Sequence, residues 1–327
     1  MEQALSDIKV LDLTHYIAGP YCTKLLSGLG AEVIKIERPG VGDPARRLGP
    51  FLKDEPHSER SGLFLYLNDN KRGITLNLKT KAGVNIFKEL AKKADVVVES
   101  FSPRVMPALG LDYETLRKVN PNLVMTSISN FGQNGPYRDY KASENVIEAL
   151  SSLMYTNGPY EHPVQMSLYL TQYVAGIAAA GATMIALYSV EGGGDRVDVS
   201  LMEAAFWLAS PTGFMTYPYT GLIFGRNTKY TAGDTLGEVF PTKDGSYLKP
   251  MFYGYIDMEL LAQLFDAPEL ASPDFAMYAD RTMHAKRFQE ILSAFLPRQE
   301  KDFWHTAQEF KLPCAPVQSS EDLVNCP

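Results

Sequence analysis

The segment 8–37, IKVLDLTHYIAGPYCTKLLSGLGAEVIKIE, decides the fold class. Two β-rich runs, 8–13 and 32–37, flank a helical stretch at 21–28 that ends in glycines. A strand, a helix and a second strand in this order form a βαβ crossover, which makes the two strands parallel neighbours in one sheet. The segment therefore predicts an α/β domain.

The same alternation continues along the chain to about residue 200. It predicts further helices at 82–93, near 171–190 and from about 201, and further strands at 95–99, 123–128 and 196–199. We therefore expect a parallel sheet with helices on both faces, within a large domain that covers residues 1–216.

The sequence changes character after about residue 217. A glycine-rich and aromatic stretch, 217–237, predicts a linker or lid, and short strands and helices in 238–317 predict a smaller α+β domain. A helix-start pattern follows in 318–327. We interpret this last piece as the start of a return segment to the large domain, in a chain that is truncated.

Composition excludes several classes of protein. The 327 residues carry 31 basic and 38 acidic side chains, a net charge of −7, which argues against a nucleic-acid-binding protein but allows one local basic pocket. Three distant cysteines and five histidines form no disulfide framework and no metal-ligand spacing. We expect no metal and no nucleic-acid partner.

One stretch raises the question of a membrane span. Residues 163–190 contain no charged side chain, but they are rich in small and polar residues. This composition favours a helix buried inside an α/β protein. The N-terminus also lacks the basic and apolar regions of a signal peptide. We expect a cytoplasmic protein without a membrane partner.

The first βα turn does not fit a dinucleotide. Residues 14–20 read THYIAGP, with one glycine instead of the G-x-G-x-x-G pattern, so we reject NAD. Ligands of parallel sheets bind beyond the carboxyl ends of the strands, where we expect four basic residues: Arg38, Lys71, Arg72 and Lys141. Each of them alone could equally be a solvated surface charge.

Several segments together resemble one enzyme family, the family III CoA-transferases of the CaiB/BaiF type. The segments are 7–15, 18–21, 29–39, 42–44, 70–79, 94–101, 132–137 and 312–317. The family includes formyl-CoA, carnitine and benzylsuccinate CoA-transferases and the α-methylacyl-CoA racemases. The resemblance implies a Rossmann-like large domain, a small domain and an interlocked dimer, with CoA as substrate and no other cofactor.

The resemblance also implies where CoA lies, along the loops at the strand ends. With the basic residues above, the expected contacts are His15, Ala18, Arg38, Lys71, Arg72, Leu76, Lys79, Phe101 and Lys141. Two positions depart from the family: Ser100 stands where asparagine is common, and Ala108 where an arginine binds.

The catalytic position departs further. The family nucleophile is an aspartate in a motif close to D-Y-x-A-G, whereas residues 172–176 of this chain read QYVAG. Gln172 cannot form the mixed anhydride on which the aspartate chemistry depends, because the amide lone pair is delocalised. The racemase reaction needs the same aspartate and a histidine near Ser143, and both are missing. The glycine-rich lid is reduced to 231–237.

Glu144 is the candidate for a substitute carboxylate. The alternative, which we favour, is that Glu144 orients the ligand or caps a helix beginning near Asn145. Tyr169 and Tyr173 either line an acyl pocket or belong to the core.

Two functions stay open. The chain is a CoA-transferase that acts on a CoA thioester and a carboxylic acid, through Glu144 or in a form that the single chain does not show. Alternatively, it is a non-catalytic, CoA-binding subunit, a pseudoenzyme paired with a paralogue that supplies the aspartate. A homodimer and a heterodimer are accordingly both possible.

Overall fold

The computed structural model describes residues 3–158, 162–166, 168–189, 193–209, 217–219, 221, 239–252 and 256–326. The chain divides into two compact units: 1–158 with 163–224, and 159–162 with 225–327. Most of the predicted linker or lid, 217–237, lies outside the described residues, and so does the predicted reduced lid at 231–237.

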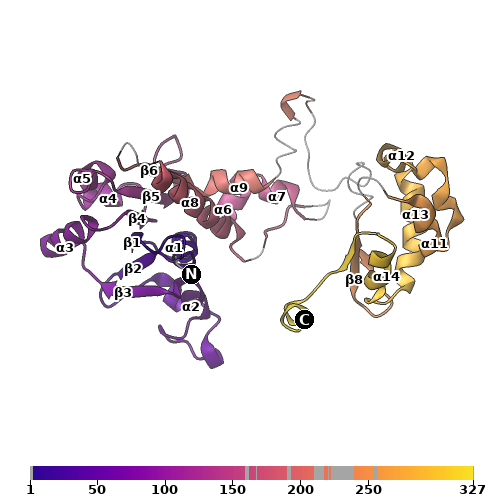
Figure 1. The fold of residues 1–327 in the computed structure, drawn as a ribbon, viewed down its shortest axis with the longest axis horizontal. Helices are drawn as coiled ribbons and strands as arrows, with labels where there is room; N and C mark the ends of the chain where they lie inside the picture. The colour runs from indigo at the N-terminus through magenta and orange to yellow at the C-terminus, as the bar shows by residue number, and fades with distance from the viewer. Residues whose placement is uncertain are drawn as a thin grey trace. The chain divides into compact units, whose positions relative to one another are not determined.

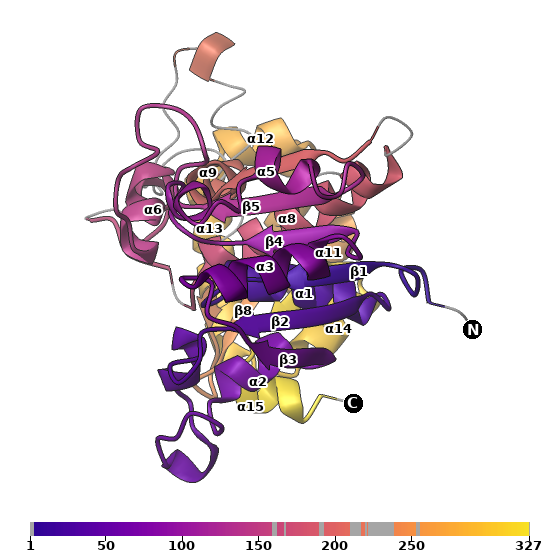
Figure 2. The ribbon, with the colours of Figure 1, turned by 90° about the vertical axis from the view of Figure 1, so that its left-hand side faces the viewer.

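The first unit is built on a six-stranded parallel sheet with the order β3-β2-β1-β4-β5-β6 (Figure 2). The strands are β1 (Lys9–Asp12), β2 (Glu32–Glu37), β3 (Lys71–Thr75), β4 (Val96–Glu99), β5 (Val124–Ser129) and β6 (Arg196–Ser200). Val10 of β1 pairs with Val33 of β2 and Val96 of β4. The strand order reverses between β1 and β4, which is where open α/β sheets bind their ligands. The predicted α/β class is confirmed.

Helices cover both faces of this sheet (Figure 1). One face carries α1 (Ala18–Gly28), α8 (Leu170–Tyr188) and α9 (Leu201–Ala209). The other carries α3 (Lys81–Ala91), α4 (Val105–Ala108) and α5 (Tyr113–Arg117). The remaining helices of the unit with described bounds are α2 (Gly62–Asn68), α6 (Glu144–Leu150) and α7 (Leu153–Thr156), with short 3-10 turns at Pro44–Arg47 and Leu52–Asp54.

The long apolar helix α8 packs on one side and is exposed on the other. Ala175, Ala179 and Thr183 are buried, and the Thr183 hydroxyl shares a 2.7 Å hydrogen bond with Thr126 of β5. Ile185 on the other side is 72% exposed. By length and composition α8 is also the one helix among the described residues that could cross a membrane, with 39% of its apolar window buried. The predicted burial in the α/β core is therefore confirmed for one face.

The second unit is a small α+β fold, as predicted. Its antiparallel sheet has the order β7-β8-β9, with β7 (Phe240–Pro241), β8 (Tyr247–Pro250) and β9 (Cys314–Pro316). The helices are α11 (Met258–Leu264), α12 (Tyr278–Met283), α13 (Ala285–Phe295), α14 (Phe303–Glu309) and α15 (Ser320–Val324), with 3-10 turns at Pro268–Ala271, Pro273–Phe275 and Leu296–Arg298. Buried phenylalanines, among them Phe252 and Phe288, form its core.

Candidate functional site

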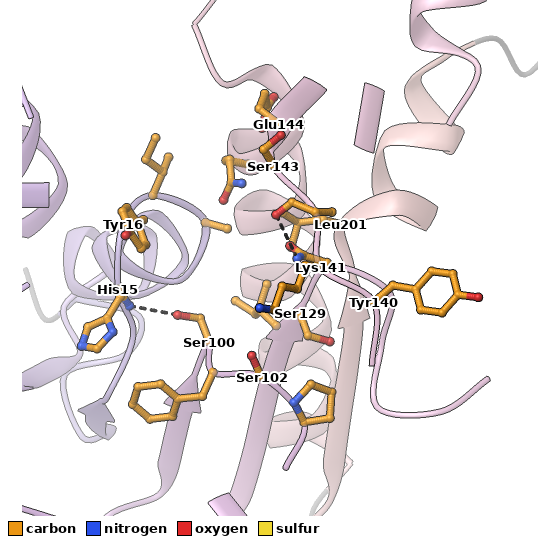
Figure 3. Close-up of a pocket in the computed structure, with 18 of the residues that line it drawn as sticks. His15, Tyr16, Ser100, Ser102, Ser129, Tyr140, Lys141, Ser143, Glu144 and Leu201 are labelled. Atoms are coloured by element: carbon orange, nitrogen blue, oxygen red, sulfur yellow. Dashed lines mark hydrogen bonds between the residues drawn. The ribbon is translucent and has the colours of Figure 1, made fainter. Parts of the chain in front are cut away.

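A cavity of about 900 Å³ lies in the first unit at the carboxyl ends of β1, β4 and β5 (Figure 3). Its walls come from the loops that follow these strands and from the start of α8. They are formed by His15–Ala18, Leu48, Ser100–Arg104, Ile128–Asn130, Arg138–Glu144, Tyr169, Gln172 and Leu201. In Figure 3, Ser143 and Glu144 lie at the top of the view, whereas Ser100 and Ser102 lie below. The cavity therefore occupies the reversal of strand order, between β1 and β4.

Buried carboxylates hold the loop after β1 from behind. Asp12 accepts hydrogen bonds from the backbone N–H and the hydroxyl of Thr14, at 2.9 and 2.5 Å. Asp43 accepts from the backbone N–H of Tyr16 at 3.1 Å, and the N–H of His15 donates to the Ser100 hydroxyl at 2.9 Å. Because the backbone N–H groups of Thr14, His15 and Tyr16 all donate to buried or partly buried side chains, His15 and Tyr16 form a defined edge of the cavity.

A buried cluster of charges stabilises these carboxylates. The Lys35 Nζ lies 3.0 Å from Asp43 Oδ2, and the Lys71 Nζ lies 3.2 Å from Asp12 Oδ2. Burial alone would raise the pKa of Asp12, but the two lysines and the threonine hydroxyls hold it well below its ordinary value. Burial lowers the pKa of Lys71 to about 8, although Asp12 opposes that shift. The cluster is internal structure and not ligand-binding surface.

Two of the predicted CoA contacts were wrongly placed. Lys71 and Arg72 begin β3, so they lie at the amino end of the sheet and not on a loop at a carboxyl end. The Lys71 Nζ is buried and also donates to the Pro20 carbonyl at 2.8 Å and to Asn68 at 2.9 Å. Arg72 pairs with Glu32, the first residue of β2, at 3.0 Å. The sequence KRGIT gave no strand signal because β3 is an exposed edge strand.

The other predicted contacts lie at the expected end of the sheet. His15, Ala18, Phe101 and Lys141 line the cavity, and the rings of His15 and Phe101 meet edge to face at 5.2 Å. Three contacts lie outside the cavity lining: Arg38 directly follows β2, whereas Leu76 and Lys79 follow β3. Burial, then the positive charges of Lys35 and Arg38, lower the pKa of His15 against the opposing effect of Asp43, so its imidazole is neutral at pH 7.

Two glycines allow close packing around this loop, Gly19 at the start of α1 and Gly176 in α8. A Cβ on Gly19 would lie 2.2 Å from Thr14 Cβ, and one on Gly176 would lie 2.7 Å from the carbonyl oxygen of Ala18. Only glycine fits either position without a shift of its surroundings. Close packing of α1 and α8 therefore brings the first turn of α8, with Gln172, to the cavity.

Glu144 holds the N-terminus of α8. Its buried carboxylate accepts from the backbone N–H of Thr171 at 2.9 Å and from the Thr171 hydroxyl at 2.7 Å. The expectation that Glu144 caps a helix beginning near Asn145 is wrong, because α6 begins at Glu144 itself and the capped helix is α8. Unpaired N–H groups at a helix start favour an anion, which explains the contact. Glu144 and Gln172 both line the cavity, and Thr171, the hydrogen-bond partner of Glu144, directly precedes Gln172 in the chain.

The two tyrosines at the start of α8 take different positions. Tyr169 lines the cavity, with a backbone φ of 57°. Tyr173 is absent from the cavity lining and packs edge to face against Tyr21, with ring centroids 4.9 Å apart. Tyr169 is thus a cavity residue, whereas Tyr173 belongs to the α1–α8 packing.

The cavity also contains charged residues that sequence reasoning missed. Arg104 precedes α4, and Arg138 and Asp139 belong to the segment between β5 and α6. Ala108, four residues after Arg104, is not part of the lining. The available signal was position, because both segments follow strands at the carboxyl edge.

Glu99, the last residue of β4, makes stability depend on pH. Burial raises its pKa to about 7, although Ser127 and the N–H of Phe101 donate hydrogen bonds that oppose the shift. The folded protein therefore binds more protons than the unfolded chain between pH 4.5 and 7, and stability falls as pH rises through this window. From pH 5 to pH 8 the expected loss is about 2–3 kcal/mol.

The Glu99→Gln variant is expected to lack this loss. Urea denaturation of both proteins at pH 5 and pH 8 measures the difference, since glutamine keeps an acceptor for Phe101 but does not titrate. Parallel pH profiles for the two proteins would contradict the assignment.

Among the residues with described positions, no group of three or more His, Cys, Asp or Glu side chains is arranged to hold a metal ion.

The chain is similar to known proteins over nearly its whole length. The model of "CoA-transferase family III" matches residues 5–327. The succinyl-CoA–D-citramalate CoA-transferase of Chloroflexus aurantiacus is 31% identical over 328 residues, which cover 99% of this chain and 80% of that protein. The succinyl-CoA–L-malate CoA-transferase alpha subunit of the same species is 32% identical over 334 residues, covering 98% and 76%.

A solved structure shows the same fold. The crystal structure of a CaiB/BaiF family protein from Brucella suis superimposes with a TM-score of 0.85 at 25% identity, covering 100% of this chain and 87% of that one. The chain therefore belongs to CoA-transferase family III.

Proposed function

We propose that the cavity binds a CoA thioester and that the protein transfers CoA between two carboxylic acids. One observation carries the proposal: a cavity at the reversal of strand order combines cationic side chains with a carboxylate, Glu144, at the start of a helix. CoA needs cations for its phosphates, and transfer to an acid needs a carboxylate that can hold the acyl group. Family membership and the names of the relatives support the same activity.

For the nucleotide end, we propose Lys141 and Arg38 as phosphate contacts. Lys141 is exposed in the cavity, and Arg38 lies at the carboxyl end of β2, close enough to influence His15. Lys71 is not proposed as a contact, because its Nζ is buried against Asp12. Arg72 is not proposed, because it lies at the amino end of the sheet and pairs with Glu32.

Removing either phosphate contact is expected to weaken CoA binding. Lys141→Ala and Arg38→Ala should each raise the dissociation constant by about tenfold, the effect of one lost charge-assisted hydrogen bond. Calorimetric titration with CoA measures the change. Arg72→Ala removes a cation of the same unit outside the cavity and should bind like the wild type. Unchanged affinity in Lys141→Ala or Arg38→Ala would contradict the corresponding contact.

At the acyl end, we propose Glu144 as the nucleophile. Its carboxylate attacks the thioester carbonyl, the C–S bond breaks, and a mixed anhydride and CoA thiolate form. The thiolate attacks the Glu144 carbonyl and releases the first acid, leaving a glutamyl-CoA thioester. The second acid then attacks the carbonyl of this thioester, which forms a new mixed anhydride and releases CoA thiolate. The thiolate attacks the carbonyl of the second acid in this anhydride, which forms the new acyl-CoA and releases the Glu144 carboxylate.

Thr171 and Gln172 have supporting roles in this proposal. The N–H and the hydroxyl of Thr171 each donate to one oxygen of the Glu144 carboxylate, which stabilises the ion and lowers its reactivity as a nucleophile. The Gln172 amide cannot replace the carboxylate, but its NH₂ group is a hydrogen-bond donor for the developing oxyanion.

We also propose that the protein is a dimer in the cytoplasm. Exposed apolar side chains of α8, Ile177, Ile185 and Tyr188, offer surface for a partner chain, and one relative is named as an alpha subunit. Cys22 and Cys314 are free buried thiols, which fits a reducing compartment.

A further inference from the structure

One ion pair joins two walls of the cavity. Arg104 precedes α4, and Asp139 lies 35 residues later, between β5 and α6; both residues line the cavity. The Arg104 Nε donates to Asp139 Oδ1 at 2.8 Å, and its Nη2 donates to Oδ2 at 2.6 Å. The guanidinium therefore holds the carboxylate with two parallel hydrogen bonds.

This pair can open without a large loss of stability. The Arg104 and Asp139 side chains are 76% and 48% exposed, and ion pairs in water contribute little because both charges are well hydrated when apart. A phosphate offers the same two-oxygen geometry to a guanidinium as a carboxylate does. A ligand phosphate can therefore take the place of Asp139 on Arg104.

The charges around Asp139 favour such an exchange. Arg138 lies next to it, with Nε 4.0 Å from Asp139 Oδ1, and that buried Nε makes no hydrogen bond with the described residues. Lys141 lines the cavity two residues further on. The lining of the cavity thus contains three cations, Arg104, Arg138 and Lys141, and two carboxylates, Asp139 and Glu144, which leaves an excess of positive charge for an anionic ligand.

We propose that Asp139 occupies a phosphate-binding site on Arg104 in the empty protein, and that a phosphate of the bound CoA displaces it. Arg104 is then a binding residue and Asp139 an internal competitor. The inference rests on the proposed function in that it takes CoA as the phosphorylated ligand.

Displacement predicts effects of opposite sign at the two residues. Arg104→Gln loses the phosphate contact and should weaken binding by about tenfold. Asp139→Asn loses the competitor and a like charge beside the phosphate, so it should tighten binding by about fivefold at low salt. If the ion pair only stabilises the arrangement of the two cavity walls, both variants should change the affinity for the ligand in the same direction, because each breaks the same contact.

Calorimetric titrations with CoA and with 3′,5′-ADP at low salt test the inference. The matched controls are Arg72→Gln and Glu32→Gln, which break another exposed ion pair of the unit outside the cavity. They should leave both affinities unchanged. Asp139→Ala should tighten binding like Asp139→Asn, which separates loss of the charge from any contact of the new amide.

Each outcome decides between the alternatives. Weaker binding by Arg104→Gln and tighter binding by Asp139→Asn support displacement, whereas changes of equal sign, or no change in either variant, overturn it. If the two variants change the affinity for 3′,5′-ADP in opposite directions but no CoA is transferred from acyl-CoA, the inference stands and the proposed function fails. If transfer occurs and the signs are equal, only the inference fails. If the wild type binds neither ligand, both fail.

Discussion

Gln172→Asp is expected to form an acyl adduct at residue 172 and to transfer CoA about 10–100 times faster than the wild type. In the proposed mechanism the wild-type nucleophile, Glu144, is held by two charge-assisted hydrogen bonds from Thr171, each worth about 1.5–3 kcal/mol, which lower the reactivity of the carboxylate. A carboxylate at position 172 is not held in this way. It also lies in the first turn of α8, where the helix dipole favours negative charge.

Gln172→Asn is the matched control. It has the length of aspartate but keeps the amide, so a gain confined to the aspartate variant belongs to the carboxylate and not to the shorter side chain. Initial rates of CoA transfer, together with mass mapping of the hydroxylamine-sensitive adduct, measure the effect. An adduct that stays at Glu144, or a rate equal to that of Gln172→Asn, would argue against a reactive position at 172.

Glu144→Gln is expected to lower the transfer rate at least about 1000-fold, the scale of removing a covalent nucleophile. The amide cannot form the anhydride, but its carbonyl oxygen can still accept from the Thr171 N–H, so the start of α8 keeps one of its two anchors. CoA binding should change far less than transfer. Titration calorimetry and initial rates on the same preparation separate the two effects.

Thr171→Val distinguishes chemistry from anchoring. It removes the hydroxyl that holds one Glu144 oxygen and leaves the backbone N–H in place. If Glu144 reacts, this variant should transfer CoA at least as fast as the wild type. If Glu144 serves only to hold α8, Thr171→Val and Glu144→Gln should lose activity together, and that result would remove Glu144 from the reaction.

The sequence predicts the central sheet well for a physical reason. The runs that become β1, β2, β4 and β5 are buried and rich in Val and Ile, so their composition alone identifies them. The edge strand β3 has no such signal, because four of its five residues are exposed. Missing it also displaced Lys71 and Arg72, which were assigned to the wrong end of the sheet.

Part of the site could also be predicted from the sequence. His15, Ala18, Phe101 and Lys141 line the cavity because they follow strands that the sequence identifies. The contact on which the proposed chemistry depends, between Glu144 and Thr171, could not be predicted from the sequence. Glu144 meets Thr171 27 residues away, through the path of the segment between α6 and α8, and the sequence pattern does not encode that path.

The most direct test is to locate the acyl carrier in the unmodified chain. The protein is incubated alone with succinyl-CoA, quenched with hydroxylamine or borohydride, and mapped by peptide mass spectrometry. The expected result is a modification at Glu144, absent in Glu144→Gln and absent when CoA replaces succinyl-CoA. CoA transfer without an adduct at Glu144 would contradict the proposed mechanism. Transfer that appears only after an aspartate-bearing paralogue is added would show instead that the chain is the non-catalytic partner.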